Sequence, residues 1–238
     1  MNLFPQDHCL ICHDMIQPAI GWKAIFSEDK ETLNCPTCES KFEKINGEKC
    51  RICSRLFRDL DERFRFDDLC HDCVRWEEDL EWQGYLDSNH SLFLYNDFFK
   101  EVMAKYKFRG DYVLAKLFAE RISDSLRLLN PDLLVPIPLS CERLYERGFN
   151  QAEALILEAG FSPANLLTRI HLEKQSKKSR TERIHIPQVF QVNRQLEIKG
   201  KEILLIDDIY TTGSTLRHAA KLLKEEGAKR IRSLTLAR

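Results

Sequence analysis

The order of apolar and polar residues predicts alternating strands and helices from residue 91 to the end of the chain. Short apolar runs over 91–95, 133–137, 203–206 and 231–236 are typical of strands. Between them, apolar side chains recur every three or four residues and predict helices over about 97–109, 113–129, 151–159 and 216–226. Asn96 or Asp97 can cap the first helix, and Gly110 ends it. This alternation favours an α/β fold with a parallel sheet.

The clearest unit of this pattern comes last in the chain. A buried strand, ILLI at 203–206, is followed by a loop, an amphipathic helix that stops at Gly227, and a second strand. This succession is a βαβ unit. In a parallel α/β sheet, ligands bind beyond the carboxyl ends of the strands, so the residues after Ile206 are candidates for a binding site.

Residues 1–73 show a different pattern, in which short apolar patches alternate with turn residues and no helical period is sustained. Eight of the nine cysteines lie in this segment, as four CxxC pairs. The pairs are Cys9/Cys12, Cys35/Cys38, Cys50/Cys53 and Cys70/Cys73. A segment with so little apolar surface needs another source of folding free energy, and metal ligation supplies one.

The spacing of the cysteine pairs indicates two structural Zn²⁺ ions. Zinc takes four ligands tetrahedrally, and one CxxC knuckle supplies two of them, so two pairs complete a closed site. We prefer the sequential grouping, in which the first two pairs form one site and the last two form another; interleaved and nested groupings stay open. Iron–sulfur clusters are an alternative that knuckles this far apart suit less well.

The distribution of charged and apolar residues limits the cellular compartment and the class of ligand that we expect. Residues 1–90 carry 11 Lys and Arg against 19 Asp and Glu, whereas residues 91–238 carry 25 against 18. The basic excess suits a phosphorylated ligand or nucleic acid. No signal-like leader appears, and no run approaches the roughly twenty apolar residues that span a bilayer. We therefore expect a cytoplasmic protein, in which reduced cysteines bind metal rather than form disulfides.

The domain organisation follows from these two patterns. We expect a cysteine-rich double zinc-ribbon module over 1–73, a connector over 74–90 and an α/β domain over 91–238. The connector contains Trp76, Trp82 and the acidic run 77–81, and reads as a short helix that ends near Gly84. We expect this amphipathic helix to dock its tryptophans on the α/β domain.

Two carboxylates and a hydroxyl-rich loop follow the strand ILLI. Asp207 and Asp208 can accept hydrogen bonds from vicinal hydroxyls such as those of a ribose. The next residues provide hydroxyls, backbone N–H groups and one glycine before a helix N-terminus, which favours an anion. These residues are Thr211, Thr212, Gly213, Ser214 and Thr215. A diol site therefore adjoins a phosphate site, and the loop is neither a Walker loop nor a GxGxxG loop.

The run ILLIDDIYTTGSTL resembles the phosphoribosyl pyrophosphate motif of type I phosphoribosyltransferases, in the version found in the ComF/ComFC family of competence proteins. The resemblance implies a type I phosphoribosyltransferase-like parallel sheet flanked by helices, with a small N-terminal zinc-ribbon module. It also implies that Asp207 and Asp208 hold the ribose hydroxyls, that residues 211–215 hold the 5′-phosphate, and that Mg²⁺ accompanies the ligand. No catalytic residue is assigned.

Other segments extend the resemblance in family order. VPIPLS at 135–140 resembles the pyrophosphate loop, and ERGFNQ at 146–151 and KFRGD at 107–111 match the family pattern. The candidate pyrophosphate ligands are Pro138, Leu139, Ser140 and Arg147, whose planar guanidinium suits phosphate oxygens. The basic segment 169–183 resembles the loop that closes over the substrate, and the same charges could track a nucleic-acid backbone. Its candidate residues are Lys174, Lys177, Lys178, Arg180 and Arg183.

The resemblance implies a competence protein that handles incoming single-stranded DNA during natural transformation. Its expected partners are a DNA-dependent helicase-like ATPase of the competence machinery and single-stranded DNA itself, in the cytoplasm or at the inner face of the membrane through partners. Two alternatives stay open: an active phosphoribosyltransferase in nucleotide or amine metabolism, and a zinc-ribbon adaptor whose α/β domain is catalytically idle.

Overall fold

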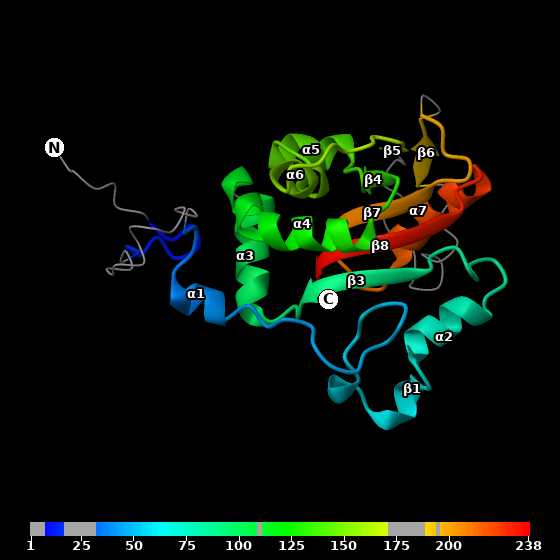
Figure 1. The fold of residues 1–238 in the computed structure, drawn as a ribbon, viewed down its shortest axis with the longest axis horizontal. Coiled ribbons are helices and arrows are strands. Elements are labelled where there is room, and N and C mark those ends of the chain that lie inside the picture. The colour runs from blue at the N-terminus through cyan, green and yellow to red at the C-terminus, as the bar shows by residue number, and fades with distance from the viewer. Residues whose placement is uncertain (1–7, 17–31, 109–110, 171–188, 194–195) are drawn as a thin grey trace.

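A four-stranded parallel sheet forms the centre of the protein in a computed structural model that describes residues 8–16, 32–108, 111–170, 189–193 and 196–238. The strand order is β3-β8-β7-β4, and every neighbouring pair is parallel (Figure 1). The strands are β3 (Ser88–Phe93), β4 (Leu133–Pro136), β7 (Glu202–Ile209) and β8 (Arg230–Ala237). The predicted α/β fold with a parallel sheet is confirmed.

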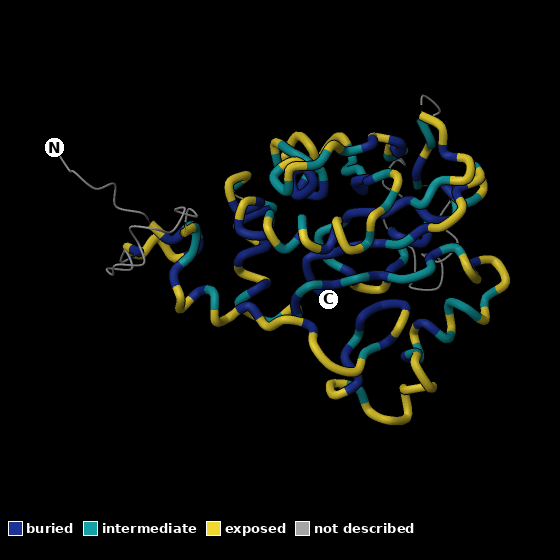
Figure 2. Tube along the Cα trace, in the orientation of Figure 1, coloured by how far each residue is buried: buried dark blue, intermediate teal, exposed yellow. Residues whose placement is uncertain are grey.

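Helices cover both faces of the sheet. α3 (Asp97–Phe108), α4 (Lys116–Leu129) and α6 (Gln151–Glu158) contribute to a core that includes Leu204 and Ile206 of β7. α7 (Ser214–Glu225) packs in a second core that includes Ile203 and Leu205. Successive residues of a strand point to opposite faces, so a strand covered on both sides needs a continuous apolar run. Figure 2 shows this burial along the central strands.

Several element boundaries differ from those expected. The first strand lies at Ser88–Phe93 rather than 91–95, because its pairing with β8 begins at Ser88 and Arg232. The helix expected over 113–129 begins as a 3-10 turn, η4 (Tyr112–Ala115), before α4. Helix α5 (Cys141–Arg147) and the hairpin of β5 (Leu167–Arg169) with β6 (Phe190–Val192) have no counterpart among the expected elements. They are too short to show a sequence period.

The cysteine-rich region contains only short elements among its described residues. They are α1 (Pro36–Ser40), η2 (Phe57–Asp59), η3 (Glu62–Phe64), β1 (Arg65–Phe66), β2 (Leu69–Cys70) and α2 (His71–Glu78). Between the second and third cysteine pairs the chain runs along the edge of the sheet, where Lys44 bridges Phe93 of β3. Cys9, Cys35 and Cys38 belong to the core of α3, α4 and α6, whereas Cys50, Cys53, Cys70 and Cys73 belong to the core of α7.

Both tryptophans of the connector dock on the α/β domain, as predicted, but the helix, α2, ends at Glu78 rather than near Gly84, so Trp82 lies beyond it. Trp76 Nε1 donates a hydrogen bond to the carbonyl oxygen of Thr212 at 3.2 Å. Trp82 is 3% exposed and packs edge-on against His218 of α7, with ring centroids 4.5 Å apart. The connector therefore reaches the loop that precedes α7 as well as the helix itself.

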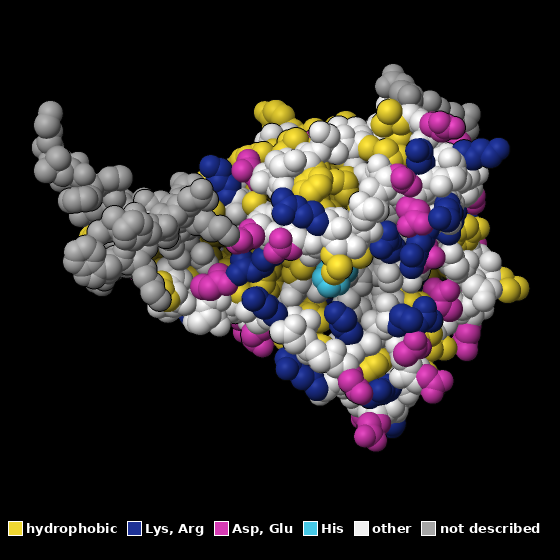
Figure 3. Space-filling model, in the orientation of Figure 1, with side chains coloured by type: hydrophobic (Ala, Val, Ile, Leu, Met, Phe, Trp, Pro, Cys, Tyr) yellow, Lys and Arg dark blue, Asp and Glu magenta, His cyan; other side chains and the backbone are white. Residues whose placement is uncertain are grey.

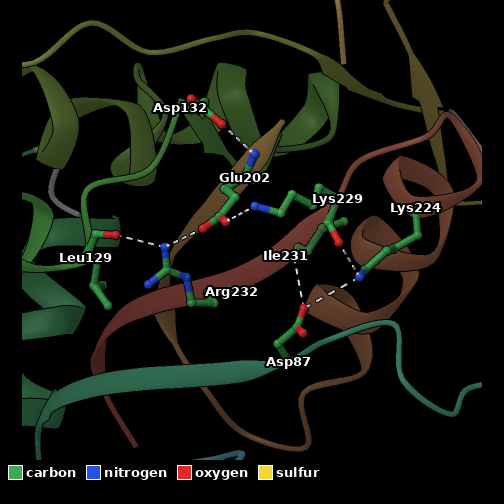
Figure 4. Close-up of polar contacts among 8 residues, drawn as sticks. All are labelled: Asp87, Leu129, Asp132, Glu202, Lys224, Lys229, Ile231 and Arg232. Carbon is green, nitrogen blue, oxygen red and sulfur yellow. Dashed lines mark hydrogen bonds and ion pairs between the residues drawn. The ribbon is translucent and has the colours of Figure 1, made fainter. Parts of the chain in front are cut away.

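Ion pairs and hydrogen bonds connect the amino-terminal ends of the sheet strands (Figure 4). Glu202 at the start of β7 contacts Lys229 at 2.9 Å and Arg232 at 3.5 Å, and its backbone N–H donates to Asp132. Asp87 accepts from the backbone N–H of Ile231 at 2.9 Å. These contacts hold the strands in register at their amino-terminal ends, whereas the candidate site lies at their carboxyl ends.

Candidate functional site

The acid pair lies at the carboxyl end of the central strand β7. The sequence places Asp207 and Asp208 after the strand, but β7 continues through them to Ile209, because its pairing with β8 extends to Ala237. Residues 203–206 are buried, whereas the last three residues of β7 are partly exposed. The carboxylates therefore stand where the parallel sheet opens toward a ligand.

Four cations from three different elements gather around the acid pair. Lys107 Nζ of α3 lies 2.6 Å from Asp208 Oδ2, and both side chains are only about 15% exposed. Arg147 of α5 and Arg169 of β5 are buried enough to lower the pKa of each guanidinium, and the charges of Asp208 and Asp207 respectively oppose that shift. Arg143 repels both arginines. This concentration of positive charge suits a polyanion such as a pyrophosphate group.

The loop between β4 and α5 carries Pro138, Leu139 and Ser140. Ser140 Oγ accepts from the backbone N–H of Arg143 at 3.3 Å and caps α5. Asn150 Nδ2 donates to the Ile137 carbonyl at 3.0 Å, which ties the start of this loop to α6. Arg147 donates to Gln151 Oε1 at 2.8 Å. Three of the pyrophosphate candidates thus lie on a loop held at both ends, and the fourth, Arg147, is the last residue of α5.

Asp207 has a strongly altered acidity. Burial and the negative charge of Asp208 raise the pKa of Asp207 from 3.8 to about 7, although the backbone N–H of Asp208 donates to its Oδ1 at 2.9 Å. Lys107 and Arg169 act in the opposite direction. A hydroxyl or a cation that bound to Asp207 would replace lost solvation and favour the ionised carboxylate.

The raised pKa of Asp207 predicts a pH-dependent cost to stability. The folded state holds the Asp207 proton up to about pH 7, whereas the unfolded state releases it near 3.8, so stability falls as pH rises between these values. The slope is at most about 1.36 kcal/mol per pH unit. Asp207→Asn should abolish this fall. Urea unfolding of both proteins from about pH 5.5 to about pH 8 measures it, and parallel stability curves would contradict the assignment.

The phosphate-loop candidates stand at the N-terminus of α7. Thr211 and Thr212 are exposed, Ser214 and Thr215 are partly exposed, and Gly213 is the N-cap of the helix in the left-handed conformation, with φ 77°. Gly213 offers no side-chain cap, and the backbone N–H of Ser214, the first residue of α7, makes a long hydrogen bond of 3.4 Å to Thr212 Oγ1. The backbone N–H groups of this turn and the loop hydroxyls can therefore bind an anion.

Gly213 is required by space as well as by backbone conformation. A Cβ at this position would overlap the Tyr210 hydroxyl and lie 2.6 Å from Arg217 Nη1. Gly213→Ala should displace both side chains and lower the affinity for inorganic phosphate or phosphoribosyl pyrophosphate by about tenfold or more, which corresponds to about 1.4 kcal/mol. Gly200→Ala is the matched control, because Gly200 has φ 75° with nothing within 4 Å of a Cβ. Equal effects of the two variants on ligand affinity would contradict the claim that the space around Gly213 excludes a Cβ.

The cysteines gather in the sequential grouping that we preferred. The four sulfurs of Cys9, Cys12, Cys35 and Cys38 lie within 4.8 Å of one another, as do those of Cys50, Cys53, Cys70 and Cys73. The Sγ atoms of Cys12 and Cys35 are 3.7 Å apart, and those of Cys53 and Cys70 are 3.5 Å apart. Zinc–sulfur bonds of about 2.3 Å give tetrahedral edges of roughly 3.8 Å. Both groups therefore fit a structural Zn²⁺, and we name them the first and the second tetrad.

Some site residues were not singled out by the sequence pattern. Lys107, Arg169 and Arg217 reach the site or its loop only through the tertiary fold. Lys107 lies within KFRGD, which was the one available signal for it. The basic candidates Lys174, Lys177, Lys178, Arg180 and Arg183 lie outside the described residues.

The comparisons with known proteins agree with this geometry. A family model described as a phosphoribosyl transferase domain matches residues 113–238. The fold and the site thus define a protein with a phosphoribosyltransferase domain preceded by two cysteine tetrads. The chain is 38% identical over 235 residues to competence protein ComFC of Bacillus subtilis (strain 168), covering 97% of this chain and 94% of that protein. The chain belongs to the ComF/ComFC family.

The chain is similar to two further proteins. Competence protein ComFC of Streptococcus pneumoniae is 35% identical over 231 residues, covering 97% of this chain and 99% of that protein. DNA utilization protein YhgH of Escherichia coli O157:H7 is 29% identical over 133 residues, covering 53% of this chain and 57% of that protein. Among the described residues, no helix combines the length and apolar character needed to cross a membrane.

Proposed function

We propose that this protein binds phosphoribosyl pyrophosphate with Mg²⁺ at the carboxyl end of β7 and acts in the handling of single-stranded DNA during natural transformation. The observation that carries the ligand assignment is the acid pair 207–208, which adjoins the phosphate loop 211–215. The positive charges of Lys107 and Arg147 interact with this pair. The names of the relatives, which refer to competence and to DNA utilization, support the cellular role.

Each part of the ligand has a matching group in this site. Asp207 and Asp208 accept hydrogen bonds from the two ribose hydroxyls, and the backbone and hydroxyl donors of 211–215 hold the 5′-phosphate. Ser140 and the guanidinium of Arg147 hold the pyrophosphate. Mg²⁺ would screen the phosphate charge when the ligand is bound. Lys107 forms an ion pair with Asp208, so it adds a further positive charge to the site.

The proposed partners are single-stranded DNA and a DNA-dependent helicase-like ATPase of the competence machinery. Figure 3 shows Lys and Arg interspersed with Asp and Glu on one face of the described residues, without one continuous basic track. The basic candidates from Lys174 to Arg183, which lie outside the described residues, are the proposed contacts with DNA. Phosphate contacts of this kind weaken steeply with salt.

Transfer of the phosphoribosyl group to an acceptor is the second candidate function. The same cations that bind pyrophosphate would stabilise it as a leaving group. Release of pyrophosphate from phosphoribosyl pyrophosphate, measured with a panel of amine and nucleobase acceptors, separates an enzyme from a binding protein.

Complementation tests the proposed function in a cell. In a Bacillus subtilis strain that lacks its competence protein ComFC, this protein should restore transformation, and the Asp207→Asn/Asp208→Asn double variant at equal abundance should not. Restoration by the double variant would show that the phosphoribosyl site is idle and would favour a zinc-ribbon adaptor. Failure of the wild type to restore transformation, when present at the normal level, would count against the competence role.

A further inference from the structure

Helix α2 connects the second tetrad to the phosphate loop. Cys70 is the N-cap of α2 and Cys73 lies in its first turn, so the tetrad holds the amino-terminal end of the helix. One turn further on, Trp76 donates its indole N–H to the carbonyl oxygen of Thr212, in the middle of the phosphate loop. The helix has only eight residues, and Trp76 lies one turn after Cys73, so a displacement of the tetrad is expected to move Trp76 as well.

Arg217 of α7 also contacts this helix. Its side chain is 0% exposed, its guanidinium lies 4.8 Å from the Trp76 ring centroid, and Nη2 is 3.9 Å from Glu77 Oε1. Neither Nε nor Nη2 has a hydrogen-bond partner among the described residues. A fully buried cation with so few hydrogen bonds needs negative charge close by.

Glu77 of α2, whose Oε1 lies 3.9 Å from Arg217 Nη2, supplies part of that charge. Burial lowers the pKa of Arg217, but Tyr210, Cys73 and Glu77 outweigh it and raise the pKa above the usual value. Four thiolates on one Zn²⁺ carry a formal charge of about −2. Such a charge would also favour the buried Arg217 cation, whose direct contacts in α2 are Trp76 and Glu77.

Arg217 also determines the shape of the phosphate loop. Its Nη1 donates to the Tyr210 hydroxyl at 2.7 Å, and these two groups fill the space where a Cβ of residue 213 would stand. Arg238 lies 4.8 Å from the centroid of the Tyr210 ring. The two ends of the loop are therefore positioned by Tyr210 and Arg217, and Tyr210 packs in the same core as the four cysteines of the second tetrad.

The first tetrad has no such connection among the described residues. Cys9, Cys35 and Cys38 pack in the core of α3, α4 and α6, which lies on the other face of the sheet from α7. The neighbours of this region include Arg121 of α4, which pairs with Glu39. The two metal centres therefore differ in what they support.

We propose that the second tetrad, acting through α2 and Arg217, positions the phosphate loop, so that its metal occupancy, and not that of the first tetrad, determines the order of the loop and its affinity for a phosphate group. Trp76 and Arg217 are positioning residues in this scheme. The affinity part rests on the proposed function, whereas the order of the loop does not.

Hydrogen exchange of the peptide that covers residues 211–217 tests the link without a ligand. Trp76→Phe keeps a ring over Arg217 but removes the N–H donor to Thr212, and it should accelerate exchange in this peptide by about tenfold, which corresponds to about 1.4 kcal/mol of local stability. Trp82→Phe is the matched control, because Trp82 lies on the same connector and its Nε1 has no hydrogen-bond partner. It should leave exchange in the loop within about twofold of the wild type. Unchanged exchange in Trp76→Phe would overturn the proposal.

The metal part of the proposal is tested with one cysteine from each tetrad. Cys53→Ser and Cys12→Ser should each lose one zinc per chain by metal analysis, but only Cys53→Ser should accelerate exchange in the loop. Equal acceleration in both variants would overturn the proposal. If Cys53→Ser fails to fold, Cys12→Ser still tests the metal part, because accelerated exchange in that variant would overturn the proposal, and Trp76→Phe tests the link through α2.

Titration of phosphoribosyl pyrophosphate with Mg²⁺ then separates this proposal from the proposed function. Trp76→Phe should bind about tenfold more weakly than the wild type and Trp82→Phe equally well. A wild type that binds no ligand would refute the proposed function, while the exchange data would still decide whether the tetrad orders the loop.

Discussion

Replacing Asp207 and Asp208 together with asparagine is expected to abolish the binding of phosphoribosyl pyrophosphate while the fold persists. Hydrogen bonds to charged groups contribute about 1.5–3 kcal/mol each, so loss of two charged acceptors lowers affinity by about two to four orders of magnitude. We expect the fold to persist because desolvation makes the Asp207 carboxyl costly to ionise, and because Asp207 and Asp208 both lie at the partly exposed end of β7.

Thermal unfolding with and without ligand measures this effect. At a ligand concentration of about one hundred times the dissociation constant, binding stabilises the wild type by about 2.7 kcal/mol, a rise in Tm of roughly 5–10 °C. The double variant should show no rise. Asp132→Asn is the matched control, because Asp132 lies at the opposite edge of the sheet, where it accepts from the Glu202 N–H. A ligand-induced rise in the double variant equal to that of the wild type would contradict the site.

Loss of a ligand in the second tetrad is expected to have the largest effect on stability. All four of its cysteines are buried in the core that contains α7, so Cys53→Ser should release one zinc and lower the free energy of unfolding by several kcal/mol. Structural zinc contributes about 10–16 kcal/mol in isolated zinc-finger peptides, which makes a drop of this size reasonable.

The first tetrad should release its metal more readily. Cys12 is exposed, whereas Cys9, Cys35 and Cys38 are buried, so a chelator has access to the metal only on the side of Cys12. Stepwise addition of a chelator, with zinc release and urea unfolding followed together, should give an early step that Cys12→Ser abolishes. Release of both ions in one step, or a Cys53→Ser variant as stable as the wild type, would contradict this description.

The sequence predicted those parts of the fold and site that are encoded locally. The run ILLI, the two aspartates, Gly213 and the helix after it are consecutive, and each CxxC knuckle is complete within four residues. The sheet followed from the alternation of strands and helices, because a buried parallel strand requires an unbroken apolar run.

The remaining parts depend on contacts between distant segments. Arg217 looks like a solvated helix residue until Trp76 and Glu77 of the connector cover it, and Trp76 is 136 positions from its partner Thr212. Lys107 meets Asp208 only because α3 and β7 end at the same edge of the sheet. The cysteine spacing likewise does not show that the tetrads pack in two different cores.

Calorimetric titration of phosphoribosyl pyrophosphate with Mg²⁺ into the zinc-loaded protein tests the central claim most directly. The account predicts saturable binding at one site per chain that requires Mg²⁺, is retained in Asp132→Asn and is lost in the Asp207→Asn/Asp208→Asn variant. Absence of saturable binding to a folded wild type that carries both zinc ions would contradict it, as would undiminished binding to the double variant.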